Sequence, residues 1–167
     1  AISAEGGQAE AAYLDVTRSD QIQELIEETA SKHGRLDYMF NNAGIATLGE
    51  VRDMTPEQWD RIIRINLMGV VYGTTAAYSL MVKQGFGHIV NTGSITGRIP
   101  VPYQAVYAAT KAAVISMTES LQYELEVEGL QFSVFCHVHG QLVFGLCRAL
   151  FHCHDAQKSQ PVHRSSL

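Results

Sequence analysis

Short apolar runs alternate with long helical patterns along most of this 167-residue chain. The runs "LDYMF", "HIVNTGS" and "LQFSVFC" have the length of strands, and their apolar residues are typical of strands buried in a parallel sheet. Parallel neighbours need a crossover connection of a dozen or more residues, which the intervening helical patterns supply. The sequence therefore predicts an α/β fold built on a parallel sheet.

Capping residues mark where the predicted helices begin and end. Thr55, Pro56 and Gln58 form a capping-box pattern at the start of a helix that could extend to about Lys83. An earlier helical pattern ends at Gly34, a residue suited to a helix C-terminus. We expect helices at 19–33, 56–83 and 104–128, and strands at 12–15, 36–40, 88–94 and 130–136.

Charge and composition exclude several classes of function. The formal net charge is −5 at pH 7, so no basic field would attract nucleic acid or an anionic membrane. No apolar run approaches the roughly 20 residues of a membrane-spanning helix, so no membrane partner is expected. The chain has three cysteines, an odd number that suits a reducing compartment better than a disulfide framework. We therefore expect a cytoplasmic protein.

Two polar segments stand where predicted strands end. "NNAG" follows the run at 36–40, and "NTGS" closes the run that begins at His88. Ligands of open parallel sheets bind beyond the carboxyl ends of the strands. Both segments are therefore expected to border a binding site.

Tyr107 and Lys111 stand four positions apart in "YAATK", at the head of the next predicted helix. Residues at this spacing share one face of a helix. A phenol titrates near 10, and bringing its pKa to about 7 takes roughly 4 kcal/mol of extra stabilisation of the phenolate. A neighbouring ammonium is the most direct source of it, so the pair could serve as a general acid/base. Most pairs at this spacing lie on solvated faces and have no catalytic role.

Ser94 and Asn66 could complete such a site. The Ser94 hydroxyl, at the end of a strand, could share a substrate oxygen with the Tyr107 phenol as charge develops there. Asn66 falls on the apolar stripe of the preceding helix, where a buried amide needs hydrogen-bond partners, of which water could be one. A lone Asn in such a stripe is usually a satisfied core amide. It is the combined order of these residues along the chain that indicates a catalytic site.

That order resembles the short-chain dehydrogenase/reductase family. The matching segments are "DVT", "NNAG", "INLMG", "IVNTGS" and "YAATK", within a resemblance that covers about residues 1–136. Together they are specific, although each is weak alone. The resemblance implies an incomplete Rossmann-like, doubly wound parallel sheet. It also implies that NAD or NADP serves to interconvert a small-molecule alcohol and a carbonyl compound.

The resemblance implies roles for four catalytic residues. Tyr107 would be the general acid/base, and Lys111 would lower its pKa and bind the nicotinamide ribose. Ser94 would position the substrate oxygen, and Asn66 would hold a water in a proton relay through Lys111.

It also implies a set of cofactor-binding residues. Asp15 and Val16 would contact the adenine, and Asn42 with the backbone of the next two residues would line the cofactor cleft. The implied set is Asp15, Val16, Asn42, Ala43, Gly44, Tyr107 and Lys111.

The chain departs from the family at its start. Family members begin with a strand and a TGxxxGxG turn that brings the backbone close to the pyrophosphate. "TGSITGRI" imitates its first positions, but Ile99 replaces the last glycine and Pro100 follows instead of a helix. Because the first residue is Ala1 and not Met, we expect a fragment or processed product that lacks the first two strands. The resulting gap either stays open or is closed by strand 12–15 pairing with 36–40.

The far end departs as well. The expected organisation is a partial dinucleotide-binding catalytic domain at 1–136 and a divergent, poorly ordered tail at 137–167. Soft and imidazole ligands are frequent near this end, but they lack the paired spacing of a structural zinc site, so no metal is expected. They are Cys136, His137, His139, Cys147, His152, Cys153 and His154.

Two functions remain open. The first is an oxidoreductase represented by an incomplete chain. The second is a catalytically inactive fragment or isoform that acts only by associating with full-length subunits. In the family, the helices that bear Asn66 and Tyr107 commonly pack in a dimer, so a homo-dimer or homo-tetramer is expected at full length. The loop from Ile95 to Gln104 would shape the substrate pocket, but its apolar residues do not single out a substrate.

The missing glycine-rich turn leads to a first prediction. The 167-residue chain alone should bind NAD(H) or NADP(H) weakly or not at all, because the turn that would approach the pyrophosphate is absent from its sequence. Isothermal titration of the isolated chain checks this. Micromolar binding would contradict it.

Overall fold

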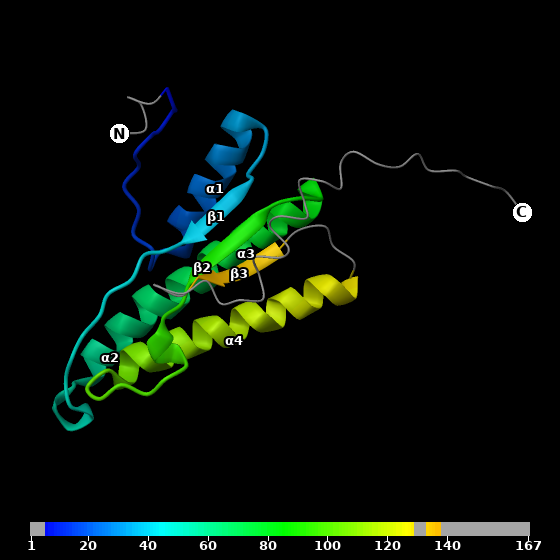
Figure 1. Cartoon of the computed structure of the whole chain (residues 1–167). Helices are drawn as coiled ribbons and strands as arrows, with labels where there is room; N and C mark the ends of the chain where they lie inside the picture. Colours follow the sequence, from blue (N-terminus) through cyan, green and yellow to red (C-terminus); the bar gives the residue numbers. More distant parts are fainter. Residues whose placement is uncertain (1–5, 129–132, 138–167) are drawn as a thin grey trace, which may run out of the picture.

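The computed structural model describes residues 6–128 and 133–137. Three parallel strands form one sheet in the order β1 (Tyr38–Asn41), β2 (His88–Thr92) and β3 (Ser133–His137), as Figure 1 shows. Tyr38 pairs with His88, and His88 pairs with Ser133, so the three carboxyl ends lie at one edge. The α/β class and the parallel, partial Rossmann-like sheet are therefore confirmed.

The helices follow the predicted boundaries closely. They are α1 (Ser19–His33), α2 (Pro56–Ile63), α3 (Gly69–Gln84) and α4 (Ala105–Glu128). The π-helical segment η3 (Arg64–Met68) joins α2 to α3, and short 3₁₀ turns form η2 (Val51–Asp53) and η4 (Ile95–Gly97). The long helix expected from Pro56 thus exists, with a widened turn in its middle.

Local hydrogen bonds explain the helix boundaries. The Thr55 hydroxyl accepts from the Gln58 backbone N–H at 3.4 Å, and the Thr55 N–H donates to Gln58 Oε1 at 2.9 Å. This confirms the capping box. Gly34 ends α1 with φ of 73°, a left-handed conformation that glycine adopts without steric cost.

The described helices cover one face of the sheet. Asn91 of β2 bonds to Thr74 of α3 and to Thr118 of α4, so both helices lie on the same side, and α1 packs against α3. On the opposite face Tyr38 and Phe40 are 53% and 64% exposed. The hydrophobic core lies between the helices and the sheet and consists of Ile22, Ile26, Leu36, Ala76, Ala77, Met81, Ile89 and Leu125.

The predicted strand at 12–15 is wrong. These residues run along α1 rather than along β1 (Figure 1), and no described strand pairs with them. The Asp15 N–H instead donates to Gln21 Oε1 at 3.1 Å, and the Asp15 carbonyl accepts from the Arg18 N–H at 3.0 Å. A strand requires a hydrogen-bonded neighbour. Among residues 6–128 and 133–137, no strand closes the gap beside β1.

Helix Pro56–Gln84, which joins α2, η3 and α3, is long and apolar enough to cross a membrane by length and composition alone. Reading uninterrupted apolar runs missed this, because the polar residues are spread along the helix. A helix of this kind is equally typical of a protein core. Here α3 packs against α1, β1 and β2, and α2 packs against α4.

The expected divergent, poorly ordered tail at 137–167 lies outside the described residues except for its first position. Within the described part, no group of three or more His, Cys, Asp or Glu side chains could hold a metal ion.

Candidate active site

The ends of β1 and β2 bring the two polar segments together. Asn42, Ala43 and Gly44 follow β1 and are exposed, while Ser94 stands two residues beyond β2. The Thr92 hydroxyl donates to Asn42 Oδ1 at 2.9 Å across the two strand ends. The parallel register thus places "NNAG" and "NTGS" at one edge of the sheet, as predicted.

A buried polar network lies directly beneath this edge. Asn41 Nδ2 donates to Asn91 Oδ1 at 2.8 Å and to Thr74 Oγ1 at 3.2 Å, and Asn91 Nδ2 donates to Thr118 Oγ1 at 3.0 Å. All four side chains are buried. The network ties both strand ends to α3 and α4, and low local dielectric makes such satisfied bonds strong. Sequence reasoning missed it, although strand alternation puts Asn91 on the same face as Ile89.

Asn66 is fully buried, and its side chain pairs with the backbone of a single residue. The Ile45 N–H donates to Asn66 Oδ1 at 2.8 Å, and Asn66 Nδ2 donates to the Ile45 carbonyl at 2.8 Å. Thr110 Oγ1 accepts a third, longer bond at 3.5 Å. The amide thus fixes the segment just after "NNAG" onto η3. Its partners in the described structure are protein groups.

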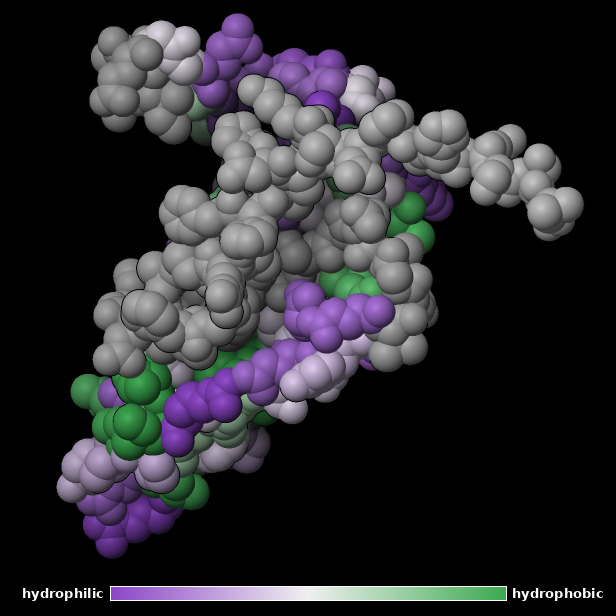
Figure 2. Space-filling view, turned by 45° about the vertical axis from the view of Figure 1, so that its right-hand side comes forward, coloured by the Kyte–Doolittle hydropathy of each residue, from purple (hydrophilic) through white to green (hydrophobic). Residues whose placement is uncertain are grey.

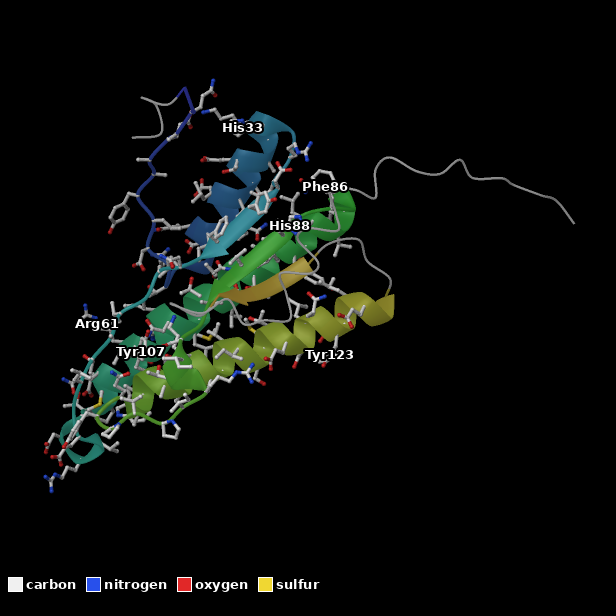
Figure 3. The ribbon with its side chains drawn as sticks, in the orientation of Figure 1. His33, Arg61, Phe86, His88, Tyr107 and Tyr123 are labelled. Atoms are coloured by element: carbon white, nitrogen blue, oxygen red, sulfur yellow. The ribbon has the colours of Figure 1, made fainter. Side chains whose placement is uncertain are left out.

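Tyr107 and Lys111 lie one turn apart at the start of α4, the end where Figure 3 places Tyr107. Lys111 is 3% exposed, and its Nζ donates to the Thr92 carbonyl at 2.6 Å. The same Nζ lies 5.8 Å from the centroid of the Tyr107 ring. A desolvated ammonium is therefore held between the end of β2 and the half-buried Tyr107 ring.

Gly44 lies next to Asn66 and Lys111. A Cβ atom at Gly44 would lie 3.4 Å from Asn66 Oδ1 and 3.8 Å from Lys111 Nζ. The structure thus brings together Gly44, Asn66 and Lys111, three of the residues predicted from sequence, around the end of β1.

Ser94 sits beside the cluster but points into its own turn. Its Oγ accepts from the Thr96 hydroxyl at 2.9 Å and from the Thr96 N–H at 3.3 Å, which caps η4. Gly97 presses η4 against α4, since a Cβ there would lie 2.7 Å from the Lys111 carbonyl carbon. Ser94 is therefore held next to α4, and its sharing of a substrate oxygen with Tyr107 stays a prediction.

Three of the candidate cofactor residues line a small cavity. A cavity of about 180 Å³ is lined by Val16, Asn42 and Ala43, with further apolar side chains such as Ile22 and Ile65. Asp15 lies beside it in a turn of its own. Two bonds from Thr17, through its backbone N–H and its hydroxyl, hold the pKa of Asp15 below its ordinary value.

The chain is similar in sequence to known proteins. Residues 1–138 match the family described as short chain dehydrogenase. The chain is 43% identical over 119 residues to a 3-oxoacyl-(acyl-carrier-protein) reductase of Thermotoga maritima, covering 71% of this chain and 48% of that protein. It is 40% identical over 129 residues to the reductase of the same name from Synechocystis, covering 77% and 52%.

Solved structures agree with the sequence matches. A metagenomic short-chain oxidoreductase in complex with NADP superposes with a TM-score of 0.76 at 31% identity, covering 84% of this chain and 63% of that one. A short-chain dehydrogenase from Streptomyces avermitilis gives 0.74 at 28% identity, covering 81% and 49%. The chain spans about half the length of the curated relatives it matches.

Proposed function

The chain belongs to the short-chain dehydrogenase/reductase family, and on that basis we propose that it carries the catalytic part of an NAD- or NADP-dependent oxidoreductase. The reaction is the interconversion of an alcohol and a carbonyl compound. The names of its Thermotoga and Synechocystis relatives, both reductases of a 3-oxoacyl group, support this class of reaction.

One observation carries the proposal: the buried Lys111 ammonium, 2.6 Å from the Thr92 carbonyl and 5.8 Å from the Tyr107 ring centroid. The buried ammonium thus lies beside the ring of the proposed acid/base. In the proposed reaction Tyr107 gives its proton to a substrate carbonyl oxygen, or takes one from a carbinol.

The neighbouring residues position the substrate and the proton path. The Ser94 hydroxyl turns from Thr96 to the substrate oxygen and stabilises the charge that develops there. Asn66 contributes to a proton relay through Lys111. The Asn66 side chain is already bonded to the Ile45 backbone, so the relay water binds elsewhere on η3. There the π-helical turn interrupts the regular hydrogen bonding of the backbone carbonyls.

The residues present fit a dinucleotide. The apolar cavity beside Val16 and Ala43 suits a flat adenine ring, and the exposed backbone at Gly44 lies next to Asn66 and Lys111. A bound NAD or NADP would supply or accept the hydride. The structural neighbour in complex with NADP supports this choice of cofactor.

Isotope transfer tests the proposal. The gene product, with whatever sequence flanks residues 1–167, is incubated with a carbonyl panel and cofactor deuterated at C4 of the nicotinamide. We expect deuterium on the carbinol carbon of the product alcohol. An inactive chain that acts only through association with other subunits would transfer no label under any condition.

The proposal also covers the oligomeric state of the protein and its location in the cell. The protein forms a homo-oligomer in the cytoplasm, with residues 1–136 as the catalytic unit. Sedimentation of the gene product measures its assembly directly.

A further inference from the structure

We propose that the mouth of this site binds an extended apolar substituent of the substrate. The substrate class is then ketones or secondary alcohols that carry an aliphatic chain or fused rings, rather than small polar or anionic carbonyl compounds. The identity of the reacting group rests on the proposed function, whereas binding of the apolar substituent can be measured separately.

Large apolar side chains are exposed on the two loops beyond β1 and β2. Their exposure ranges from 37% to 72%, although leaving such side chains in water is unfavourable. We call them the apolar rim: Leu48, Val51, Ile95, Ile99, Val101 and Tyr103. They follow directly after "NNAG" and Ser94 in the chain.

The two loops form one surface. The Gly49 N–H donates to the Tyr103 carbonyl at 2.9 Å, which ties the loop after β1 to the loop before α4. Figure 2 shows hydrophobic residues gathered at the lower left of the molecule, the end where these loops and α2 lie in Figure 1. Tyr103 lies two residues before the start of α4, which carries Tyr107 in its first turn, so the apolar rim leads into the helix of the proposed acid/base.

The backbone of Tyr103 is held in an unfavourable conformation. Its φ is 65°, in the left-handed region that bulky residues rarely adopt. Such strain persists where the surroundings impose it, and it clusters at ligand sites. Here the bond from Gly49 fixes the backbone while the Tyr103 side chain remains 60% exposed. The conformation thus presents an aromatic ring at the mouth of the site.

The charges on the two loops do not favour an anionic ligand. Arg52 pairs with Glu50, and Arg98 pairs with Glu119. Asp53 adds a negative charge to the first loop. Within the described part of both loops, each arginine is already neutralised, and the apolar side chains remain to contact a substrate.

A series of straight-chain 2-alkanones from butanone to dodecanone tests the proposal by turnover. Burial of each added methylene should raise kcat/KM roughly two- to fourfold until the apolar rim is covered. The Tyr103→Asn variant, which keeps a residue tolerant of positive φ, should flatten this dependence, so that its kcat/KM falls most for dodecanone and least for butanone. Tyr123→Asn is the matched control, because Tyr123 is 69% exposed but lies toward the far end of α4 (Figure 3).

Methyl NMR separates this inference from the proposed function. Decan-2-one added to the 167-residue chain should shift the Leu48 and Ile99 methyl signals, and an Ile99→Ser variant should weaken that binding several-fold. Such shifts without turnover of any ketone would support the inference and contradict the proposed function. Turnover without dependence on chain length would overturn the inference and leave the function standing. A third outcome is a dimer that dissociates on Ile99→Ser while turnover shows no dependence on chain length. The apolar rim would then contact a second copy of the chain, and the inference would be overturned.

Discussion

Replacing Tyr107 by Phe is expected to lower kcat by about 10²- to 10⁴-fold, the usual contribution of a positioned acid/base. The substitution removes the phenol oxygen and keeps the ring beside Lys111. Steady-state turnover and single-turnover hydride transfer both measure the loss. The loss in kcat should exceed any loss in cofactor binding, because the substituted atom acts mainly in the transition state.

Tyr123→Phe provides the control for this substitution. It removes the same atom from the same helix at an exposed position far from the site. Its turnover should equal that of the unaltered protein. A Tyr107→Phe variant with nearly full turnover and an unchanged fold would remove Tyr107 from the mechanism.

Replacing Gly97 by Ala is expected to lower the free energy of unfolding by about 1–3 kcal/mol, the usual cost of overpacking. The added Cβ would lie 2.7 Å from the Lys111 carbonyl carbon and 2.8 Å from the Ala112 nitrogen. Backbone atoms cannot turn aside as a flexible side chain does, so η4 or α4 must shift. Because Ser94 caps η4 and Lys111 belongs to α4, turnover should fall as well. Denaturant unfolding and turnover are measured together.

Gly49→Ala is the matched control. A Cβ at Gly49 would meet the flexible Met54 side chain at 3.4 Å, an ordinary contact. The variant should unfold at nearly the same denaturant concentration as the unaltered protein. Equal stability of the Gly97 and Gly49 variants would show that η4 and α4 separate without cost.

Helix boundaries could be predicted from the sequence because they depend on local interactions. The capping box at Thr55 and the left-handed glycine at Gly34 depend on neighbouring residues alone, so helix ends were correct. The segment 12–15 has a strand-like composition, but strand formation depends on a partner elsewhere in the fold. Its assignment failed for that reason.

The features of the site that could not be predicted from the sequence depend on tertiary packing. The Tyr107–Lys111 spacing was visible, whereas the anchor of Lys111 on the Thr92 carbonyl depends on how α4 meets β2. The pairing of Asn66 with the Ile45 backbone spans 21 positions and was not foreseen. Gly97 is a similar case, because its role follows from its contact with the backbone of α4.

A double-mutant cycle on Tyr107 and Lys111 tests the central claim, that the ammonium assists catalysis by supporting the phenol. Single-turnover hydride transfer is measured at saturating cofactor for Tyr107→Phe, Lys111→Met and the combined variant. If Lys111 acts through Tyr107, the combined variant should be about as slow as Tyr107→Phe alone, since effects of residues that act as a unit are not additive. Losses that multiply would contradict the claim, because the two side chains would then act independently.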